Sequence, residues 1–242
     1  MLDVALGEMT YRSADGGAHK VLESVRFQVS DGEFVCLTGP SGCGKTTILR
    51  IILGLETDFA GSVSVDGQDG RIGVVFQEPR LLPWRSVEQN VRMVLPDSGR
   101  GQDLAPLFQA LGLESHGAFF PGELSLGLAR RVAIARAFAV EPSLLLLDEP
   151  FVSLDEPTAE RLRALLLRVW SQRPTAALMV THNLNEALEL ADRIVVLSER
   201  PATLRGDFSI PLARQDRDAA ALADLKGQFE AAFPAHKKTG SV

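Results

Sequence analysis

The chain has 242 residues, of which 45% are apolar and 23% charged, and its formal net charge is −6. This composition is typical of a globular protein that is long enough to bury a sizeable core. Lys and Arg are not clustered along the sequence, whereas a protein that wraps nucleic acid needs such clusters to neutralise phosphates. We therefore expect no nucleic-acid partner.

Three further features indicate where the protein works. The four leucines at 144–147 fall far short of the ~20 apolar residues that cross a bilayer. The N-terminal residues MLDVALGEMTYRS lack the positive region and apolar stretch of a secretory signal. Cys36 and Cys43 are spaced neither as a metal or redox motif nor as a disulfide framework. The sequence predicts a protein of the reducing cytoplasm that does not span a membrane by itself.

The first half of the chain alternates strand and helix signals. Residues 25–30 and 34–39 read as strands, and the second is apolar enough to be buried on both faces. A helix is predicted from about Lys45 to Gly54. Further strands are predicted at 62–67 and 72–77, separated by the turn sequence DGQDG.

The strand signal disappears between Pro79 and Pro121, where short amphipathic pieces such as DLAPLFQALGL predict a small helical insert. It returns in LLLLD, ALMVTH and RIVVLS, each next to a segment of helical period. Helix starts are marked at Asp155 and Asn183. Strand and helix thus alternate on both sides of an insert, which predicts an α/β fold with a parallel sheet. The residues after Arg200 carry no clear pattern, and PAHKKTGSV at the end is expected to fray.

The segment GPSGCGKTT at 39–47 fits the pattern G-x-x-x-x-G-K-[ST] and lies between a buried strand and a helix. Glycines let the chain curl so that backbone N–H groups point at phosphate oxygens, and the helix dipole favours the negative charge. Lys45 supplies a positive charge, and the Thr46 hydroxyl is suited to bind Mg²⁺. A chance Gly-rich turn is the alternative, and the strand–loop–helix context argues against it.

Polar side chains follow three other predicted strands. Asp148 and Glu149 end the strand LLLLDE, and because side chains alternate along a strand, they can take different roles. Asp148 is suited to orient Mg²⁺ and Glu149 to polarise water. Gln77 and His182 each end another strand. Singly, these residues are most often solvated caps or hydrogen-bonded structural groups. Together they would meet at the one edge of a parallel sheet where ligands bind.

Taken together, these motifs resemble the ATP-binding subunits of ABC transporters, from about residue 4 to residue 200. The resemblance rests on motifs that occur in the family's order. They are Tyr11 at the position of an adenine-stacking aromatic, 39–47 as Walker A, Gln77 as the Q-loop, ELSLGLARR (123–131) as the signature, LLLLDE (144–149) as Walker B, VSLD (152–155) as the D-loop and His182 as the switch histidine. The segment FQEPRLLPWRSVEQNV, with THNLNEALELADRIVVLSERP later, looks most like the nitrate, sulfonate and taurine importer branch.

The resemblance implies a P-loop NTPase fold with an N-terminal antiparallel β portion and a helical subdomain. It divides one domain into a nucleotide-binding core (1–78 and 138–205), a helical subdomain (79–137) and a C-terminal tail (206–242). The implied catalytic residues are Glu149, His182 and Gln77, and the implied Mg²⁺ ligands are Thr46, Gln77 and Asp148. The implied ATP-binding residues are Tyr11, Gly39, Pro40, Ser41, Gly42, Cys43, Gly44, Lys45, Thr46, Thr47, Ser125, Gly127 and Asp155.

The signature segment departs from the family pattern LSGGQ, because Leu126 replaces the first glycine and Leu128 the glutamine. Ser125 is a good N-cap for the helix that follows, and Gly127 keeps a close backbone approach to a phosphate. Leu128 is expected to begin a buried stripe, whereas Leu126 must turn away from the nucleotide. We expect backbone N–H donation to survive and hydrolysis to persist.

The resemblance implies an ATPase that dimerises around two nucleotides, drives a membrane permease from the cytoplasmic side and depends indirectly on a solute-binding protein. Three alternatives remain open at this point: a non-transport ABC protein, a catalytically weak subunit that pairs with another cassette, and a nucleotide kinase. The short insert argues against the first, and the intact Lys45, Glu149 and His182 argue against the second. The signature and switch segments argue against the third.

Overall fold

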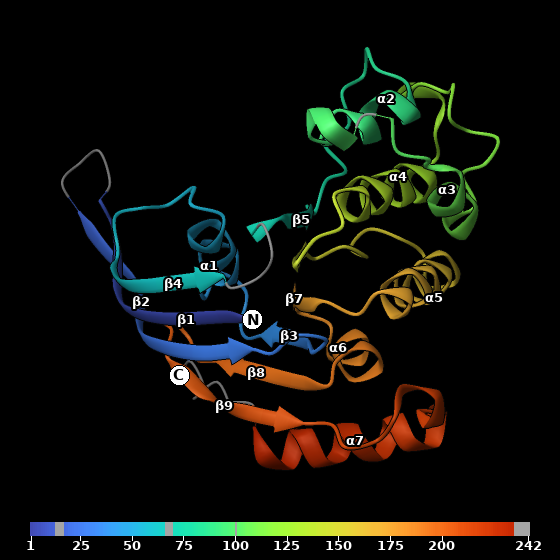
Figure 1. Cartoon of the computed structure of the whole chain (residues 1–242). Coiled ribbons are helices and arrows are strands. Elements are labelled where there is room, and N and C mark those ends of the chain that lie inside the picture. Colours follow the sequence, from blue (N-terminus) through green and yellow to red (C-terminus); the bar gives the residue numbers. More distant parts are fainter. Residues whose placement is uncertain (13–16, 66–69, 100, 235–242) are drawn as a thin grey trace.

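The computed structural model describes residues 1–12, 17–65, 70–99 and 101–234. Its larger sheet runs through the middle of the molecule and has the strand order β5-β6-β7-β3-β8-β9 (Figure 1). Neighbouring strands from β5 to β8 are parallel, and β9 is antiparallel to β8. The strands are β3 (Phe34–Thr38), β5 (Ile72–Val75), β6 (Leu144–Asp148), β7 (Ala176–Val180), β8 (Arg193–Leu197) and β9 (Leu204–Ser209). The predicted parallel α/β sheet is confirmed.

A second, antiparallel sheet has the order β2-β1-β4 and comes from the N-terminal part of the chain. Its strands are β1 (Leu2–Arg12), β2 (Ala18–Val29) and β4 (Ala60–Val65). The sequence pattern indicated only the end of β2 and did not indicate β1. The predicted turn DGQDG lies, except for Gly70, outside the described residues.

Three helices form a lobe apart from the antiparallel sheet: α2 (Val87–Arg92), α3 (Ala105–Leu111) and α4 (Leu126–Ala139) (Figure 1). The helical insert is thus present where the sequence predicts it. The remaining helices are α1 (Lys45–Ile52), α5 (Glu156–Gln172), α6 (Leu184–Leu190) and α7 (Ala219–Ala232), with short 3₁₀ turns at Asp97–Gly99, Pro121–Glu123 and Arg214–Asp216. No helix within the described residues has both the length and the apolar character that a membrane crossing requires.

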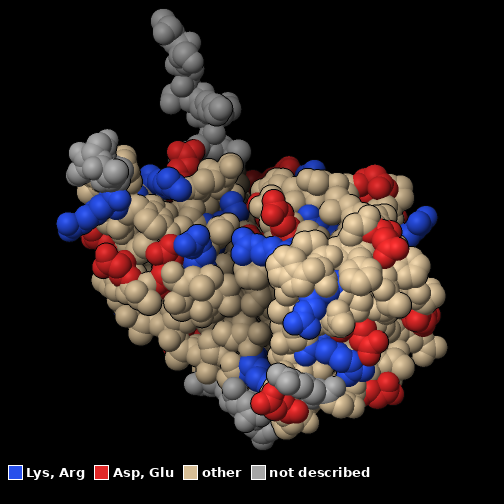
Figure 2. Space-filling view, turned by 90° about the horizontal axis from the view of Figure 1, so that it is seen from above, with Lys and Arg blue, Asp and Glu red and all other residues tan. Residues whose placement is uncertain are grey.

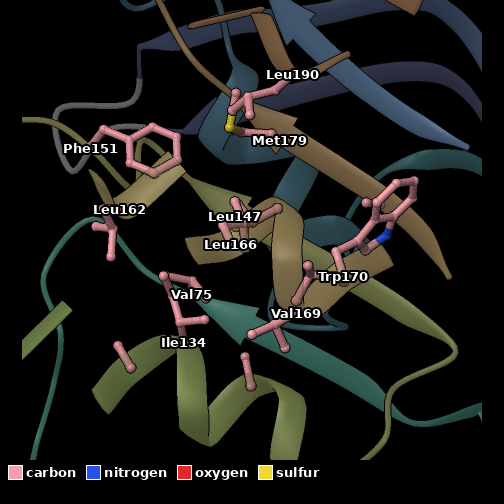
Figure 3. Close-up of a cluster of buried hydrophobic side chains, with 14 of the residues drawn as sticks. Val75, Ile134, Leu147, Phe151, Leu162, Leu166, Val169, Trp170, Met179 and Leu190 are labelled. Carbon is pink, nitrogen blue, oxygen red and sulfur yellow. The ribbon is translucent and has the colours of Figure 1, made fainter. Parts of the chain in front are cut away.

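The core has two parts, one on each face of the larger sheet. On one face, side chains of β5, β6 and β7 pack against α4, α5 and α6, as Val75, Ile134, Leu147, Leu166 and Met179 show (Figure 3). On the other face, the antiparallel sheet and α1 cover the sheet. Burial on both faces explains why β3, β6 and β7 are almost uninterrupted apolar runs. The sheet is therefore a rigid base for the loops at its edges.

The C-terminal segment belongs to this core, in contrast to the tail expected from residue 206. That boundary falls inside β9, and α7 packs against the neighbourhood of α6 through Leu225. The buried Arg217 donates hydrogen bonds to the carbonyl oxygens of Leu188, Ala191 and Leu212 at 2.8–3.0 Å. It thereby satisfies carbonyl groups at the end of α6. Of the residues expected to fray, only Pro234 is described.

Candidate functional site

The strand order brings the predicted polar residues to one edge of the sheet. β5, β6, β7 and β3 are parallel neighbours, so the segments that follow them leave the sheet on the same side. Residues 39–47 follow β3, Glu149 follows β6, and His182 follows β7. Together they line a cavity of 630 Å³. Seen from above the view of Figure 1, the molecule is divided by a groove, and several Lys and Arg side chains lie beside it (Figure 2).

The loop before α1 needs glycine for two physical reasons. Gly42 and Gly44 have φ values of 74° and 121°, which disfavour any residue with a Cβ atom. A Cβ atom on Gly44 would also lie 2.8 Å from the Leu22 side chain of β2. No side chain caps the N-terminus of α1. Its first N–H groups and dipole are therefore available to a phosphate.

Lys45 is held inside this loop by hydrogen bonds to the backbone. Its side chain is buried, and Nζ donates to the carbonyl oxygens of Gly39 at 2.9 Å and Pro40 at 3.0 Å. Every predicted residue of 39–47 lines the cavity except Cys43. Cys43 is 1% exposed, and burial raises the pKa of its thiol. Its side chain therefore packs away from the cavity.

Glu149 and His182 form a pair in the cavity. The carboxylate oxygen Oε2 of Glu149 lies 3.1 Å from Nδ1 of His182. Glu149 has a φ of 44°, a left-handed conformation that is costly for a residue with a side chain. Its N–H donates to the carbonyl oxygen of Val180 at 2.9 Å, which fixes the turn after β6 to β7. The strained turn places an oriented carboxylate beside a phosphate-binding loop, where it can accept a proton from water.

Thr46 and Asp148 bring two oxygen ligands together beside this pair, since Thr46 Oγ1 donates to Asp148 Oδ1 at 3.5 Å. Burial raises the pKa of Asp148, and the negative charge of Glu149 raises it further. A cation beside Asp148 would oppose both effects. A hydroxyl and a carboxylate fit Mg²⁺, which takes few protein ligands and completes its shell with water and phosphate oxygens. No group of three or more His, Cys, Asp or Glu residues suited to a metal occurs among the described residues.

Besides Cys43 and Asp148, five predicted site residues do not line the cavity. The Tyr11 hydroxyl donates to the Glu56 carboxylate at 3.0 Å. Gln77 is exposed beyond the end of β5. Ser125 and Asp155 each accept a hydrogen bond at the start of a helix, from the N–H groups of Leu128 and Thr158. The fifth is Gly127. One copy of the chain therefore assembles only part of the predicted nucleotide site.

The start of α4 has the form that its sequence predicts. Ser125 is the N-cap, with its hydroxyl 3.3 Å from the Leu128 nitrogen. Leu128 packs against the core, and Val132 and Ala135 are fully buried, which confirms the predicted stripe. Leu126 is 44% exposed. A Cβ atom on Gly127 would lie 3.0 Å from Cγ2 of Thr158 in α5, so this glycine also lets two helices approach.

Two arginines in or near the site were not predicted from the sequence. Arg200 lines the cavity together with the loop before α1, although no binding role was predicted for it. Arg130 of α4 is buried and donates to the carbonyl oxygens of Phe76 at 3.3 Å and Val152 at 3.1 Å. It thus joins α4 to the segments that follow β5 and β6. The signal for Arg200 was its place just after β8, at the same sheet edge as the other residues.

The fold and the cavity define a P-loop nucleoside triphosphatase. The family model described as ABC transporter matches residues 22–152, and the chain belongs to this family. As a member, it binds and hydrolyses ATP.

Among curated relatives, two proteins cover most of the chain. The aliphatic sulfonates import ATP-binding protein SsuB 2 of Burkholderia lata is 45% identical over 96% of this chain and 86% of its own length. SsuB 1 of Pseudomonas aeruginosa is 46% identical over 88% of this chain and 90% of its own length. Among solved structures, the ATP-binding cassette MJ0796, a dimer bound to ADP and Pi after hydrolysis, has a TM-score of 0.73 at 27% identity. It covers 88% of this chain, and the match includes all of the MJ0796 chain.

Proposed function

We propose that this ATPase powers a membrane importer of aliphatic sulfonates from the cytoplasmic side. The proposal rests on the cavity, which is lined by the phosphate-binding loop with Lys45 and by the Glu149–His182 pair. The import of sulfonates is supported by relatives of that description at 45% and 46% identity, which span nearly the whole chain. Nitrate and taurine stay as alternative substrates within the same branch.

The residues of the cavity have distinct tasks in hydrolysis. Lys45 and the backbone N–H groups of the loop bind and orient the β- and γ-phosphates. Thr46, Asp148 and Gln77 would hold Mg²⁺, which neutralises phosphate charge when it is bound. Glu149 accepts a proton from the attacking water as the new bond to phosphorus forms and the bond to the leaving ADP oxygen breaks. His182 keeps the Glu149 carboxylate in place through their 3.1 Å contact.

A second copy of the chain completes the site in this proposal. Ser125 and Gly127 lie at the start of α4, where helix N–H groups and the dipole suit a phosphate. They lie outside the cavity of their own chain, and Tyr11 and Asp155 do too. The dimeric state of MJ0796 supports an arrangement in which α4 of one chain faces the P-loop of the other.

The variant Glu149→Gln tests this arrangement. It lacks the proton acceptor but keeps the phosphate-binding loop, so we expect ATP to trap a dimer that elutes early in gel filtration, while hydrolysis is lost. Lys45→Ala is the matched control, since it should bind ATP weakly and stay monomeric. A Glu149→Gln protein that never dimerises with ATP, alone or with its permease, would refute the proposed arrangement.

The exposed Leu126 tests the altered signature. Leucine removes no backbone N–H group, so we expect wild-type hydrolysis to be measurable with the permease present and Leu126→Gly to equal or exceed it. Leu128→Gln serves as control, because Leu128 packs against the core and its change should lower stability instead. Absence of ATPase activity in both wild type and Leu126→Gly would contradict the proposal and favour a catalytically weak subunit.

The permease is proposed to dock near residues 80–84, which follow the Q-loop. Trp84 is 69% exposed, whereas Leu81 packs against the core. An exposed tryptophan that follows the Q-loop is a suitable contact for a membrane partner. We expect Trp84→Ala to keep the thermal midpoint and basal ATPase activity but to lose copurification with the permease. Efficient copurification of the variant, or crosslinks from position 84 to no permease residue, would count against docking.

Growth measurements test the substrate. A strain without this gene should fail to grow with an alkanesulfonate as the sole sulfur source, and the plasmid-borne gene should restore growth, whereas the Glu149→Gln variant should not. Growth on sulfate is the control. Normal growth on alkanesulfonates, with loss of growth on taurine or nitrate, would reassign the substrate within the branch. Copurification with ribosomes would instead indicate a non-transport ABC protein. In the proposed system, an extracytoplasmic solute-binding protein delivers the substrate to the permease.

A further inference from the structure

We infer that Arg200 binds the phosphate chain of the nucleotide, as a second cation beside Lys45. Arg200 is not among the predicted nucleotide-binding residues, although it lies in the segment THNLNEALELADRIVVLSERP, which resembles the importer branch. The inference rests on the position of Arg200, which lines the same cavity as the phosphate-binding loop.

Arg200 is exposed at the surface. No hydrogen bond or ion pair joins its guanidinium group to another residue in the described part of the chain. Lys45, the other cation of the cavity wall, is in contrast bonded to two carbonyl oxygens of the loop. An unpaired guanidinium at the mouth of a phosphate site offers several N–H donors without first breaking an existing bond.

Hydrogen bonds between its two ends close the loop that carries Arg200. It connects β8 to β9, and its ends are joined by the bond from the Ser198 nitrogen to the Thr203 carbonyl oxygen at 2.9 Å. The Ser198 hydroxyl also accepts from the Thr203 nitrogen at 2.9 Å. Arg200 therefore extends from a short closed turn, so its backbone position is fixed.

The same loop is fixed to the wall of the phosphate site. Ala202 is fully buried, its N–H donates to the Val21 carbonyl oxygen at 2.8 Å, and its carbonyl oxygen accepts from the Glu23 nitrogen at 2.8 Å. Between these two residues of β2 lies Leu22, which closes against Gly44 of the phosphate loop. One strand thus holds both the phosphate loop and the turn of Arg200.

The positive charge of Arg200 acts on Cys43 of the phosphate-binding loop. Burial raises the pKa of the Cys43 thiol, and the positive charges of Lys45 and Arg200 act against that rise. An anion in the cavity lies within the field of the same two cations. Because residues of the loop, Glu149 and His182 surround the cavity, this attraction is screened less than at an open surface.

Equilibrium binding of ADP to the full chain tests the inference, with inorganic tripolyphosphate as a second probe that lacks base and ribose. Loss of one charge-assisted contact should raise the Kd of Arg200→Ala about tenfold for both probes. Arg200→Lys should lose less, and Arg200→Glu more. Arg205→Ala is the matched control, since Arg205 is exposed five residues away and does not line the cavity. It should keep the Kd within about twofold of wild type.

Several outcomes would overturn the inference. A Kd of Arg200→Ala that equals that of wild type for ADP would do so. A loss for ADP without a loss for tripolyphosphate would place Arg200 on the base or ribose. An effect seen only on the ATP-trapped dimer of Glu149→Gln, with unchanged ADP binding, would assign Arg200 to the contact between two copies. Thermal midpoints are compared throughout, and Arg200→Gln replaces any variant that fails to fold.

Discussion

A methyl group added at Gly127 should separate two reasons for a glycine at this position. In Gly127→Ala, the new Cβ atom would lie 3.0 Å from Cγ2 of Thr158, which is closer than the ~3.5–4.0 Å of a normal carbon–carbon contact. Such overpacking costs about 1–3 kcal/mol, and the higher helix propensity of alanine returns up to ~1 kcal/mol. The free energy of unfolding should therefore fall by about 1 kcal/mol, a decrease of about 2–4 °C in the thermal midpoint for a chain of this size.

The second variant is Gly127→Ala/Thr158→Ser, in which the contacting Cγ2 atom is gone. The Thr158 N–H that Asp155 accepts is kept, so the start of α5 stays capped. We expect the double variant to regain the wild-type midpoint. Its ATPase activity should stay about tenfold low, because a Cβ atom at 127 still separates the helix backbone from a phosphate of the facing chain.

The measurements are thermal unfolding of the isolated protein and steady-state ATPase activity with the permease. Thr158→Ser alone is the control and should change neither by much. If ATPase activity recovered in the double variant together with the midpoint, Gly127 would serve only the packing of α4 against α5. The reasoning that places it at the nucleotide would then be wrong.

Three further predictions concern single side chains. The pKa of Asp148 is raised in the folded protein, so its ionisation opposes folding. Asp148→Asn should therefore raise the thermal midpoint at neutral pH, and the gain should shrink as the pH falls through the range in which Asp148 protonates. An unchanged or lower midpoint at neutral pH would contradict this expectation. Arg217→Ala leaves several carbonyl oxygens without a donor. It should lower the free energy of unfolding, measured by urea titration, by about 3–5 kcal/mol. A decrease below ~1 kcal/mol would mean that the C-terminal segment is dispensable for stability. Stacking on adenine needs the ring of Tyr11 and not its hydroxyl. Tyr11→Phe should therefore keep the Kd for ATP, and Tyr11→Ala should raise it about tenfold. Equal effects of the two changes would indicate that Tyr11 serves only to bond Glu56.

The parts of the fold that the sequence predicted are those whose signal is local and continuous. β3, β6 and β7 are buried on both faces, so each is an apolar run that is visible without its neighbours. β1 was missed, although Leu2, Val4 and Leu6 alternate, because a register shift after Leu6 interrupts the period. β9 was missed for a similar reason: Gly206 occupies one of its inward positions, where the Phe233 ring covers it. Only the packed structure supplies the missing side chain.

The candidate site shows the same division. Residues 39–47, Glu149 and His182 each adjoin a buried strand, so the order of strands in the sheet is enough to bring them together. Arg200 also adjoins a strand, but its loop turns toward the cavity only because Ala202 pairs with β2. That pairing joins residues about 180 positions apart and leaves no trace in the local sequence.

The arginines of α4 tie this helix to the segments that follow β5 and β6. Arg130 donates to the backbone after β5 and to the backbone after β6, and Arg136 donates to the carbonyl oxygens of Pro79 at 2.7 Å and Arg80 at 2.8 Å. Burial lowers the pKa of both side chains. A shift of either segment relative to α4 would break these charge-assisted hydrogen bonds and leave carbonyl oxygens without a donor. We therefore expect α4 to move together with the segment that leads to residues 80–84, where the permease is proposed to dock.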